Sequence, residues 1–171
     1  MIYKIILILS GVDFLPDSIL QYIKGEYAIA SKNNPQDKKH KNKEDDYGFG
    51  SISFFHPKKF ATQPNILNYE QWFINFLLDN YELFKNYGVE DYELFFEVYH
   101  DEEQCNFEIF DKILLQKISG ISISFPVSVY SVKKDEFQHW VSEIDTEWHN
   151  PLKEMTYNLE TAFKASNEIH I

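Results

Sequence analysis

The chain has 171 residues, of which 44% are hydrophobic and 17% aromatic, with only 6 Gly and 6 Pro. This composition excludes a disordered or low-complexity chain and predicts one folded domain, residues 1–171, that buries about 70% of its unfolded surface. The net charge is −11, and all 16 basic residues are lysine. Without the guanidinium fork of arginine and with a field that repels phosphates, direct binding of nucleic acid is not expected.

The single cysteine, Cys105, excludes an internal disulfide. The apolar N-terminal stretch MIYKIILILSG is too short to span a bilayer and lacks a small-residue cleavage pattern. We therefore expect a cytoplasmic protein that does not enter a membrane.

The first expected element is a strand over Tyr3–Leu9, apolar on both faces and so placed at the centre of a sheet. A short helix should follow, with Asp13 before Pro16 as its start and Gly25 as its end. Residues 32–46 contain lysines, acids and no apolar side chain, which predicts a mobile loop.

A second strand is expected in GFGSISFFHP, where Gly48 and Gly50 suggest a bend and Pro57 a stop. The clearest helix has Asn68 as its N-cap and Gly88 as its C-terminal stop. Its apolar positions recur at helical spacing and indicate a core face rather than a ligand pocket. They are Trp72, Phe73, Phe76, Leu77, Phe84 and Tyr87.

The next segment, DYELFFEVYH, alternates as a strand with one wet, acidic face and one core face. A short helix in FDKILLQKISG then precedes a second alternating strand, ISISFPVSVY. There Ile121, Ile123, Phe125, Val127 and Val129 share one side, and Ser122, Ser124 and Ser128 share the other. Because Pro126 lacks an N–H group, this strand is expected at or near a sheet border.

The tail predicts two helices, from Asp135 to about Glu147 and from Asn150 to about Phe163. Residues 1–132 would form the core of sheet and helices, and residues 133–171 a helical extension. The mixed order of elements predicts an α+β fold with a mostly antiparallel sheet of about four to five strands and helices on one face.

Two segments resemble the bacterial family called domain of unknown function 4279. ILSGVDFLPDSILQYI is similar to its opening strand, Asp-Phe-x-Pro-Asp turn and first helix, and FDKILLQKISGISISFPVSVY to its closing helix and strand. The resemblance covers about residues 1–130, although the Lys-rich loop replaces a Trp-x-x-Gly-type segment. It implies a small α+β domain without established enzymatic activity, often found beside toxin immunity proteins.

The stretch EVYHDEEQCN combines a histidine, acids and the cysteine, all of which are potential metal ligands. Its spacing does not match a closed metal site, and acids beside Cys105 disfavour a reactive thiolate. The six histidines lie in different segments and define no Ser-His-Asp arrangement. We therefore predict no metal, no cofactor and no catalytic residue, and interpret the stretch as a strand end with an exposed acidic loop.

The acidic residues have two interpretations: a charge that keeps the protein soluble, or a docking face for a basic partner with aromatic anchors. The predicted partner-binding residues are Asp91, Glu93, Glu97, Tyr99, Asp101, Glu102, Glu103, Glu143, Asp145, Glu147 and Trp148.

The hypothesis that follows is an immunity protein without enzymatic activity, which binds and neutralises a cognate bacterial toxin, a basic nuclease above all. The alternative is a sensor domain that binds a small ligand or peptide between sheet and helices, with the C-terminal helices as a lid. An enzyme ranks third, because it would need a buried polar cluster that the sequence does not reveal. The oligomeric state stays open.

Overall fold

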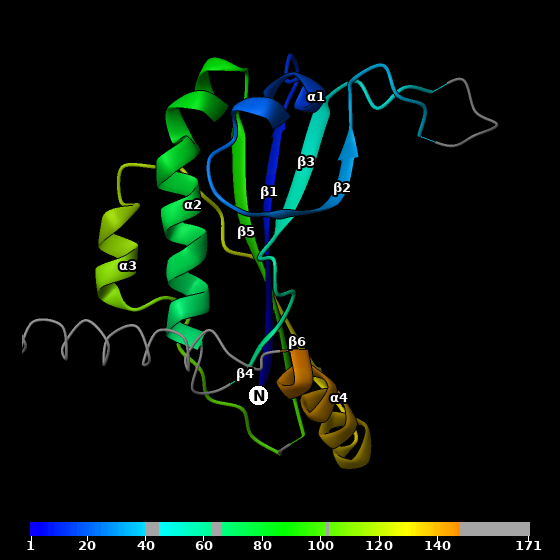
Figure 1. Ribbon diagram of the computed structural model, residues 1–171, viewed down its shortest axis with the longest axis vertical. Helices are drawn as coiled ribbons and strands as arrows, with labels where there is room; N and C mark the ends of the chain where they lie inside the picture. The colour runs from blue at the N-terminus through cyan, green and yellow to red at the C-terminus, as the bar shows by residue number, and fades with distance from the viewer. Residues whose placement is uncertain (40–44, 63–65, 102, 148–171) are drawn as a thin grey trace, which may run out of the picture.

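The computed structural model describes residues 1–39, 45–62, 66–101 and 103–147. Its strands form one six-stranded sheet: β1 (Ile2–Gly11), β2 (Ala28–Asn33), β3 (Gly50–Phe55), β4 (Ala61–Thr62), β5 (Asp91–His100) and β6 (Val127–Ser131). The helices are α1 (Pro16–Ile19), α2 (Ile66–Asn86), α3 (Lys112–Lys117) and α4 (Lys134–Glu147), and a 3₁₀ turn, η1 (Leu20–Tyr22), follows α1. Figure 1 shows these elements around the sheet.

The strand order is β2-β3-β1-β5-β6, and β4 pairs with the beginning of β1. The central strand, β1, runs antiparallel to β3, β4 and β5, whereas β5 and β6 run parallel. The predicted α+β class, the largely antiparallel sheet and the central position of the first strand are therefore confirmed. None of the described helices is long and apolar enough to cross a membrane.

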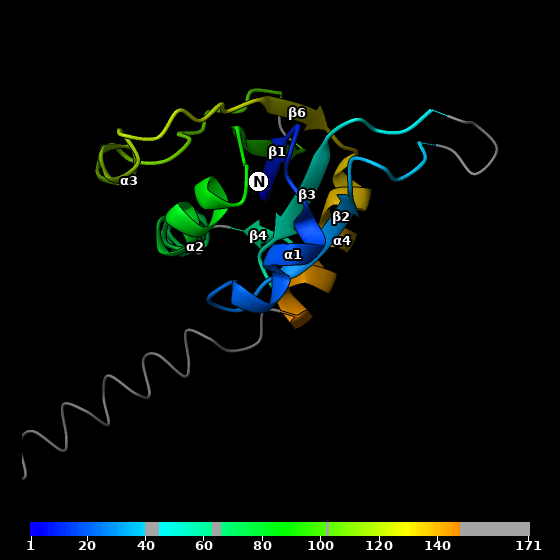
Figure 2. The same cartoon turned by 90° about the horizontal axis from the view of Figure 1, so that it is seen from above.

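The core lies between the sheet and α2. Alternation along the strands turns Leu7 of β1, Phe54 of β3 and Phe96 of β5 to this side, where all three are fully buried. Phe73 and Phe84 of α2 pack against them. We call this side of the sheet the covered face. Figure 2 shows α2 and α3 on this side and α4 on the other. The prediction of helices on one face therefore holds for α2 and α3, whereas α4 lies in the segment predicted as a separate C-terminal helical extension.

The long helix ends as predicted but begins earlier. Gly88 adopts φ 88°, its N–H donates to the Lys85 carbonyl, and the Val89 N–H donates to the Phe84 carbonyl. These two bonds form a Schellman motif, which ends the helix at a glycine. Because α2 already starts at Ile66, Asn68 lies inside the helix, and its prediction as the N-cap was wrong.

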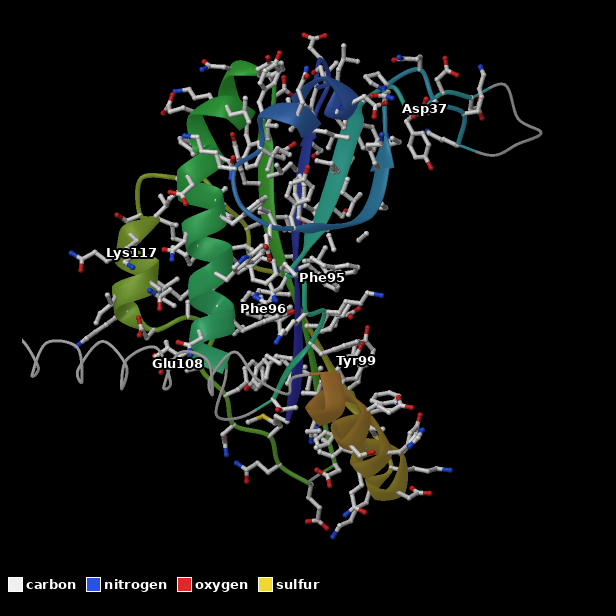
Figure 3. All side chains as sticks on the ribbon, in the orientation of Figure 1. Asp37, Phe95, Phe96, Tyr99, Glu108 and Lys117 are labelled. Carbon is white, nitrogen blue, oxygen red and sulfur yellow. The ribbon has the colours of Figure 1, made fainter. Side chains whose placement is uncertain are left out.

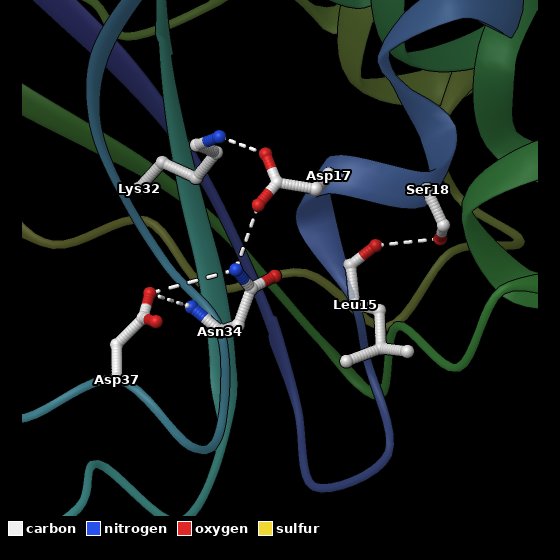
Figure 4. Close-up of polar contacts among 6 residues, drawn as sticks. All are labelled: Leu15, Asp17, Ser18, Lys32, Asn34 and Asp37. Atoms are coloured by element: carbon white, nitrogen blue, oxygen red, sulfur yellow. Dashed lines mark hydrogen bonds and ion pairs between the residues drawn. The ribbon is translucent and has the colours of Figure 1, made fainter.

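Part of the segment predicted as a loop, residues 32–46, is built into the fold. Lys32 and Asn33 belong to β2, and Lys32 forms an ion pair with Asp17 of α1. Asn34 donates from Nδ2 to Asp17 Oδ2 at 2.7 Å, and its backbone N–H donates to Asp37 Oδ2 at 2.7 Å (Figure 4). The hydrogen bonds from Asn34 and Lys32 lower the pKa of Asp17. Polar contacts to α1 thus replace the apolar burial that this segment lacks.

The opposite side of the sheet, which we call the open face, carries the other half of each alternating pattern. Its side chains are Lys4, Ile6, Ile8 and Ser10 of β1, Ser51, Ser53 and Phe55 of β3, and Glu93, Phe95, Glu97 and Tyr99 of β5. At one end of this face α4 packs on Ile2 through Phe137, Trp140 and Val141. The second predicted tail helix lies outside the described residues.

Candidate functional site

A groove with a volume of about 410 Å³ lies on the open face, where β1 ends and β5 begins. Its acids are Glu90, Asp91 and Glu93, and its neutral polar side chains are Ser10, Ser122 and Ser124. Ile8 and Ile123 complete the lining together with Tyr92. We call this site the acidic groove.

Strand pairing places these residues together. Glu93 lies opposite Ile8 of β1 on one side and forms an isolated parallel bridge with Ser124 on the other. The bridge is held by hydrogen bonds from Leu94 N–H to the Ser124 carbonyl at 2.9 Å and from Ser124 N–H to the Tyr92 carbonyl at 3.0 Å. Because successive side chains alternate, Asp91 and Glu93 point to the same face as the serine of the neighbouring segment.

No lysine that the structure describes neutralises the three carboxylates. No ion pair joins Glu90, Asp91 or Glu93 to a cation within the described ranges. Glu90 Oε2 accepts one weak hydrogen bond, from the Val12 N–H at 3.3 Å. Like charges that line one groove repel one another, so a cation bound among them would relieve that repulsion.

An exposed apolar side chain, that of Val12, lies beside the groove. Val12, whose backbone N–H donates to Glu90, is 59% exposed. A Cβ on Gly11 would lie 2.0 Å from the Gly88 carbonyl oxygen, so only glycine lets the end of β1 approach the end of α2 this closely. This close approach brings Val12 beside Glu90.

Farther along the open face, the negative charge of Glu97 is compensated by a lysine. Glu97 Oε2 lies 2.6 Å from Lys4 Nζ and accepts a hydrogen bond from the Tyr99 hydroxyl at 3.0 Å. Burial, and then the hydrogen bond to Glu97, raise the pKa of the Tyr99 hydroxyl. Glu97 and Tyr99, both predicted to bind a partner, therefore already interact within the protein.

The remaining predicted acids whose side chains the structure describes do not join the acidic groove. Asp101 follows the far end of β5, about 30 Å from Asp91 at the usual rise of a strand, and Glu103 comes two residues later. Glu143 lies on α4, 3.4 Å from His139. Asp145 and Glu147 belong to α4 but their side chains are not described, and Glu102 and Trp148 lie outside the described residues. Among the predicted residues whose side chains are described, Asp91 and Glu93 alone line the groove.

The stretch EVYHDEEQCN forms the end of β5 and the segment after it. The side chain of Cys105 is partly buried, with Sγ 3.1 Å from Met1 Sδ. Burial, and then the nearby Cys105 and Glu70, raise the pKa of the Tyr3 hydroxyl to about 12. Within the ranges that the structure describes, no three or more His, Cys, Asp and Glu side chains are grouped to hold a metal ion.

A second, more apolar cavity of about 240 Å³ lies where α4 crosses the open face. Ile2, Phe60, Tyr99, Trp140 and Glu143 line it, and the rings of Tyr99 and Trp140 pack edge to face with centroids 5.6 Å apart. This cavity lies between the sheet and a C-terminal helix, as the sensor alternative requires.

Comparison with known proteins gives no match: no family model, no curated protein and no solved structure is significantly similar to this chain. The resemblance to domain of unknown function 4279 therefore stays a prediction.

Glu90 and Ser10 were missed as site residues. Glu90 precedes the alternating strand, so its side chain could not be assigned to a face from periodicity. The serines of ISIS were correctly separated from the isoleucines, but their position beside Glu93 depends on a pairing between segments about thirty residues apart. The alternation of serine with isoleucine was the available signal for a polar wall.

Proposed function

We propose that this protein is a bacterial immunity protein, which binds a basic toxin domain in the cytoplasm and blocks its active site without chemistry of its own. The observation that carries the proposal is the acidic groove, with three carboxylates and no lysine among its lining residues. A lysine or arginine side chain of the toxin fits both its size and its charge.

The charge of the whole chain supports the same partner. A net charge of −11 attracts a basic protein from a distance, and such steering raises association rates by about 10 to 10³. A nuclease that binds nucleic acid carries basic residues at its active site, so an acidic surface is complementary to it. The exposed side chain of Val12 beside the groove supplies an apolar contact next to the charges.

An immunity gene is expected to follow its toxin gene directly, so the test uses the C-terminal domain encoded by the gene immediately upstream of this protein's gene. We would measure association rates at low and high salt for the wild type, for Asp91→Lys with Glu93→Lys, and for Asp101→Lys with Glu103→Lys. The two double variants change the net charge equally but at opposite ends of β5. We expect the groove variant to lose at least about tenfold more affinity than the control, because only its acids contact the toxin.

Equal losses in both variants would mean that general charge steers the partner, and the groove would not be the binding site. Failure of the wild type to bind or inhibit this toxin domain at either salt would refute the immunity function.

The cavity beneath α4 favours a second candidate, a sensor of a small apolar ligand or peptide. Its lining of rings with one carboxylate suits a ligand that combines an apolar body with a positive charge. Thermal unfolding with a panel of metabolites would detect binding as a raised Tm. Trp140→Ala should abolish that rise, whereas Trp72→Phe, a change in α2, should preserve it.

A further inference from the structure

The outer edge of β6 pairs with no other strand in the part of the chain that the structure describes. β6 is the last strand in the sheet order and lies at its border in Figure 2. Its inner side is bonded to β5, with Phe96 N–H donating to the Pro126 carbonyl at 2.8 Å and Val132 N–H donating to the His100 carbonyl at 2.8 Å.

These two bonds decide which backbone groups face outward. The N–H and C=O of one residue point to the same side of a strand, and consecutive residues alternate. Since Pro126 and Val132 face β5, so do Ser128 and Tyr130, and Val127, Val129 and Ser131 present their N–H and C=O groups at the free edge. Pro126 lacks an N–H group, but that position faces β5. The outer edge of β6 therefore keeps all of its hydrogen-bond donors.

The side chains around this edge carry no charge. The thirteen residues Gly120–Val132 contain no Asp, Glu or Lys, in a chain of which 25% is charged. Val127 is 39% exposed and Val129 48%, although the alternation predicted both on the same side of the strand as Ile121, Ile123 and Phe125. Phe125, two residues earlier, still packs on the core, so burial ends where β6 begins.

The other border of the sheet is protected. β2 contains Lys32, and its pairing with β3 shifts register between Ile29 and Ser31. Lysines and bulges of this kind prevent strand addition at exposed edges. β6 has neither, so its edge is open to another strand.

We propose that two copies of this chain pair through β6 as antiparallel strands around a twofold axis at Val129. In this register Val129 lies opposite its own copy, and Val127 of each chain lies opposite Ser131 of the other. The three outward residues of each strand then meet as hydrogen-bonded pairs, which exchange both N–H···O bonds. The contact is self-complementary, as a twofold interface requires.

The charge of the chain favours a second copy at this edge over the basic partner of the acidic groove. Two molecules of net charge −11 repel one another wherever their acidic surfaces approach. An uncharged β-branched strand avoids that repulsion and adds the burial of Val129 against Val129. A basic partner would gain nothing from this neutral edge.

Sedimentation velocity and light scattering over a wide concentration range test the proposal. We expect the wild type to have twice the chain mass of 20.3 kDa. Val129→Lys places two like charges opposite each other and should shift the mass to that of one chain. Ile29→Lys, a matched change on the β2 edge at a residue 41% exposed, should leave the dimer intact.

A cross-link gives a second readout that does not depend on how Val129→Lys folds. Hydrogen-bonded antiparallel pairs have Cα atoms about 5.5 Å apart, within the range of a disulfide. In a Cys105→Ser background, oxidised Val129→Cys should therefore form a covalent dimer, whereas Ile29→Cys should not. A wild type that is monomeric throughout, or a Val129→Lys variant that stays dimeric, would overturn the proposal.

Discussion

The two faces of the sheet are built from the same strands but differ in what covers them. Phe95 and Phe96, labelled in Figure 3, are neighbours in β5 and point to opposite faces. Phe96 is fully buried, with its ring centroid 5.1 Å from that of Phe110, whereas Phe95 lies on the open face and is only partly buried. One face therefore supplies stability, and the other leaves side chains available for binding.

Replacing each of these two rings by alanine measures that difference directly. Phe96→Ala should lower the free energy of unfolding by about 3–5 kcal/mol, because it opens a cavity in the core. Phe95→Ala should cost about 1 kcal/mol, since water already reaches its site. Urea unfolding of both variants gives the two values. Similar losses would show that the open face is as closely packed as the covered one.

A buried acid on the covered face makes stability depend on pH. Glu70 of α2 is 3% exposed, and its Oε1 accepts a hydrogen bond from the Phe110 N–H at 3.3 Å. Burial raises the pKa of Glu70 from 4.5 to about 7, although that hydrogen bond acts in the opposite direction. The folded protein thus keeps the carboxyl protonated at pH values where the unfolded chain ionises it. The resulting stability is complete below 4.5 and is lost as pH rises through about 7.

Glu70→Gln removes this titration and keeps an oxygen acceptor for Phe110. As pH rises from below 4.5 to above 7, the free energy of unfolding of the variant relative to that of the wild type should increase by about 3 kcal/mol. Glu103→Gln, at an exposed acid, should show no such trend. Parallel pH profiles of wild type and Glu70→Gln would contradict the raised pKa.

On the open face, the pair between Lys4 and Glu97 should contribute much less. It is partly exposed to water, so a double-mutant cycle with Lys4→Met and Glu97→Gln should give a coupling energy of about 0.5–1 kcal/mol that falls with salt. A coupling of several kcal/mol, insensitive to salt, would mean that this part of the face is shielded from solvent.

Local periodicity in the sequence was sufficient to predict the main helix, α2, and to assign the side chains of β5 to its two faces. The spacing of the apolar residues from Trp72 to Phe84 matches a helix and no other regular structure. The strict alternation from Asp91 to His100 likewise matches only a strand with one covered face. Helix starts were less predictable, because Asn68 is a good capping residue wherever it stands. β2 was hidden because its pairing depends on β3 and on contacts with Asp17 rather than on apolar residues of its own.

The sequence could predict that the candidate site is acidic, but not which residues come together to form it. An acidic surface follows from composition alone, and Asp91 and Glu93 were correctly assigned to one face of one strand. Their separation from Asp101, the compensation of Glu97 by Lys4, and the addition of Glu90 and Ser124 all depend on which strands lie side by side.

By itself, the sequence determined the class of fold, the acidity of the surface and which side chains of each strand share a face. These properties arise from composition and from the geometry of neighbouring residues. Only the tertiary structure decided which acids meet in a groove, which face α4 crosses and which strand ends the sheet. Those outcomes depend on strand order and register, which are set by contacts between residues far apart in the chain.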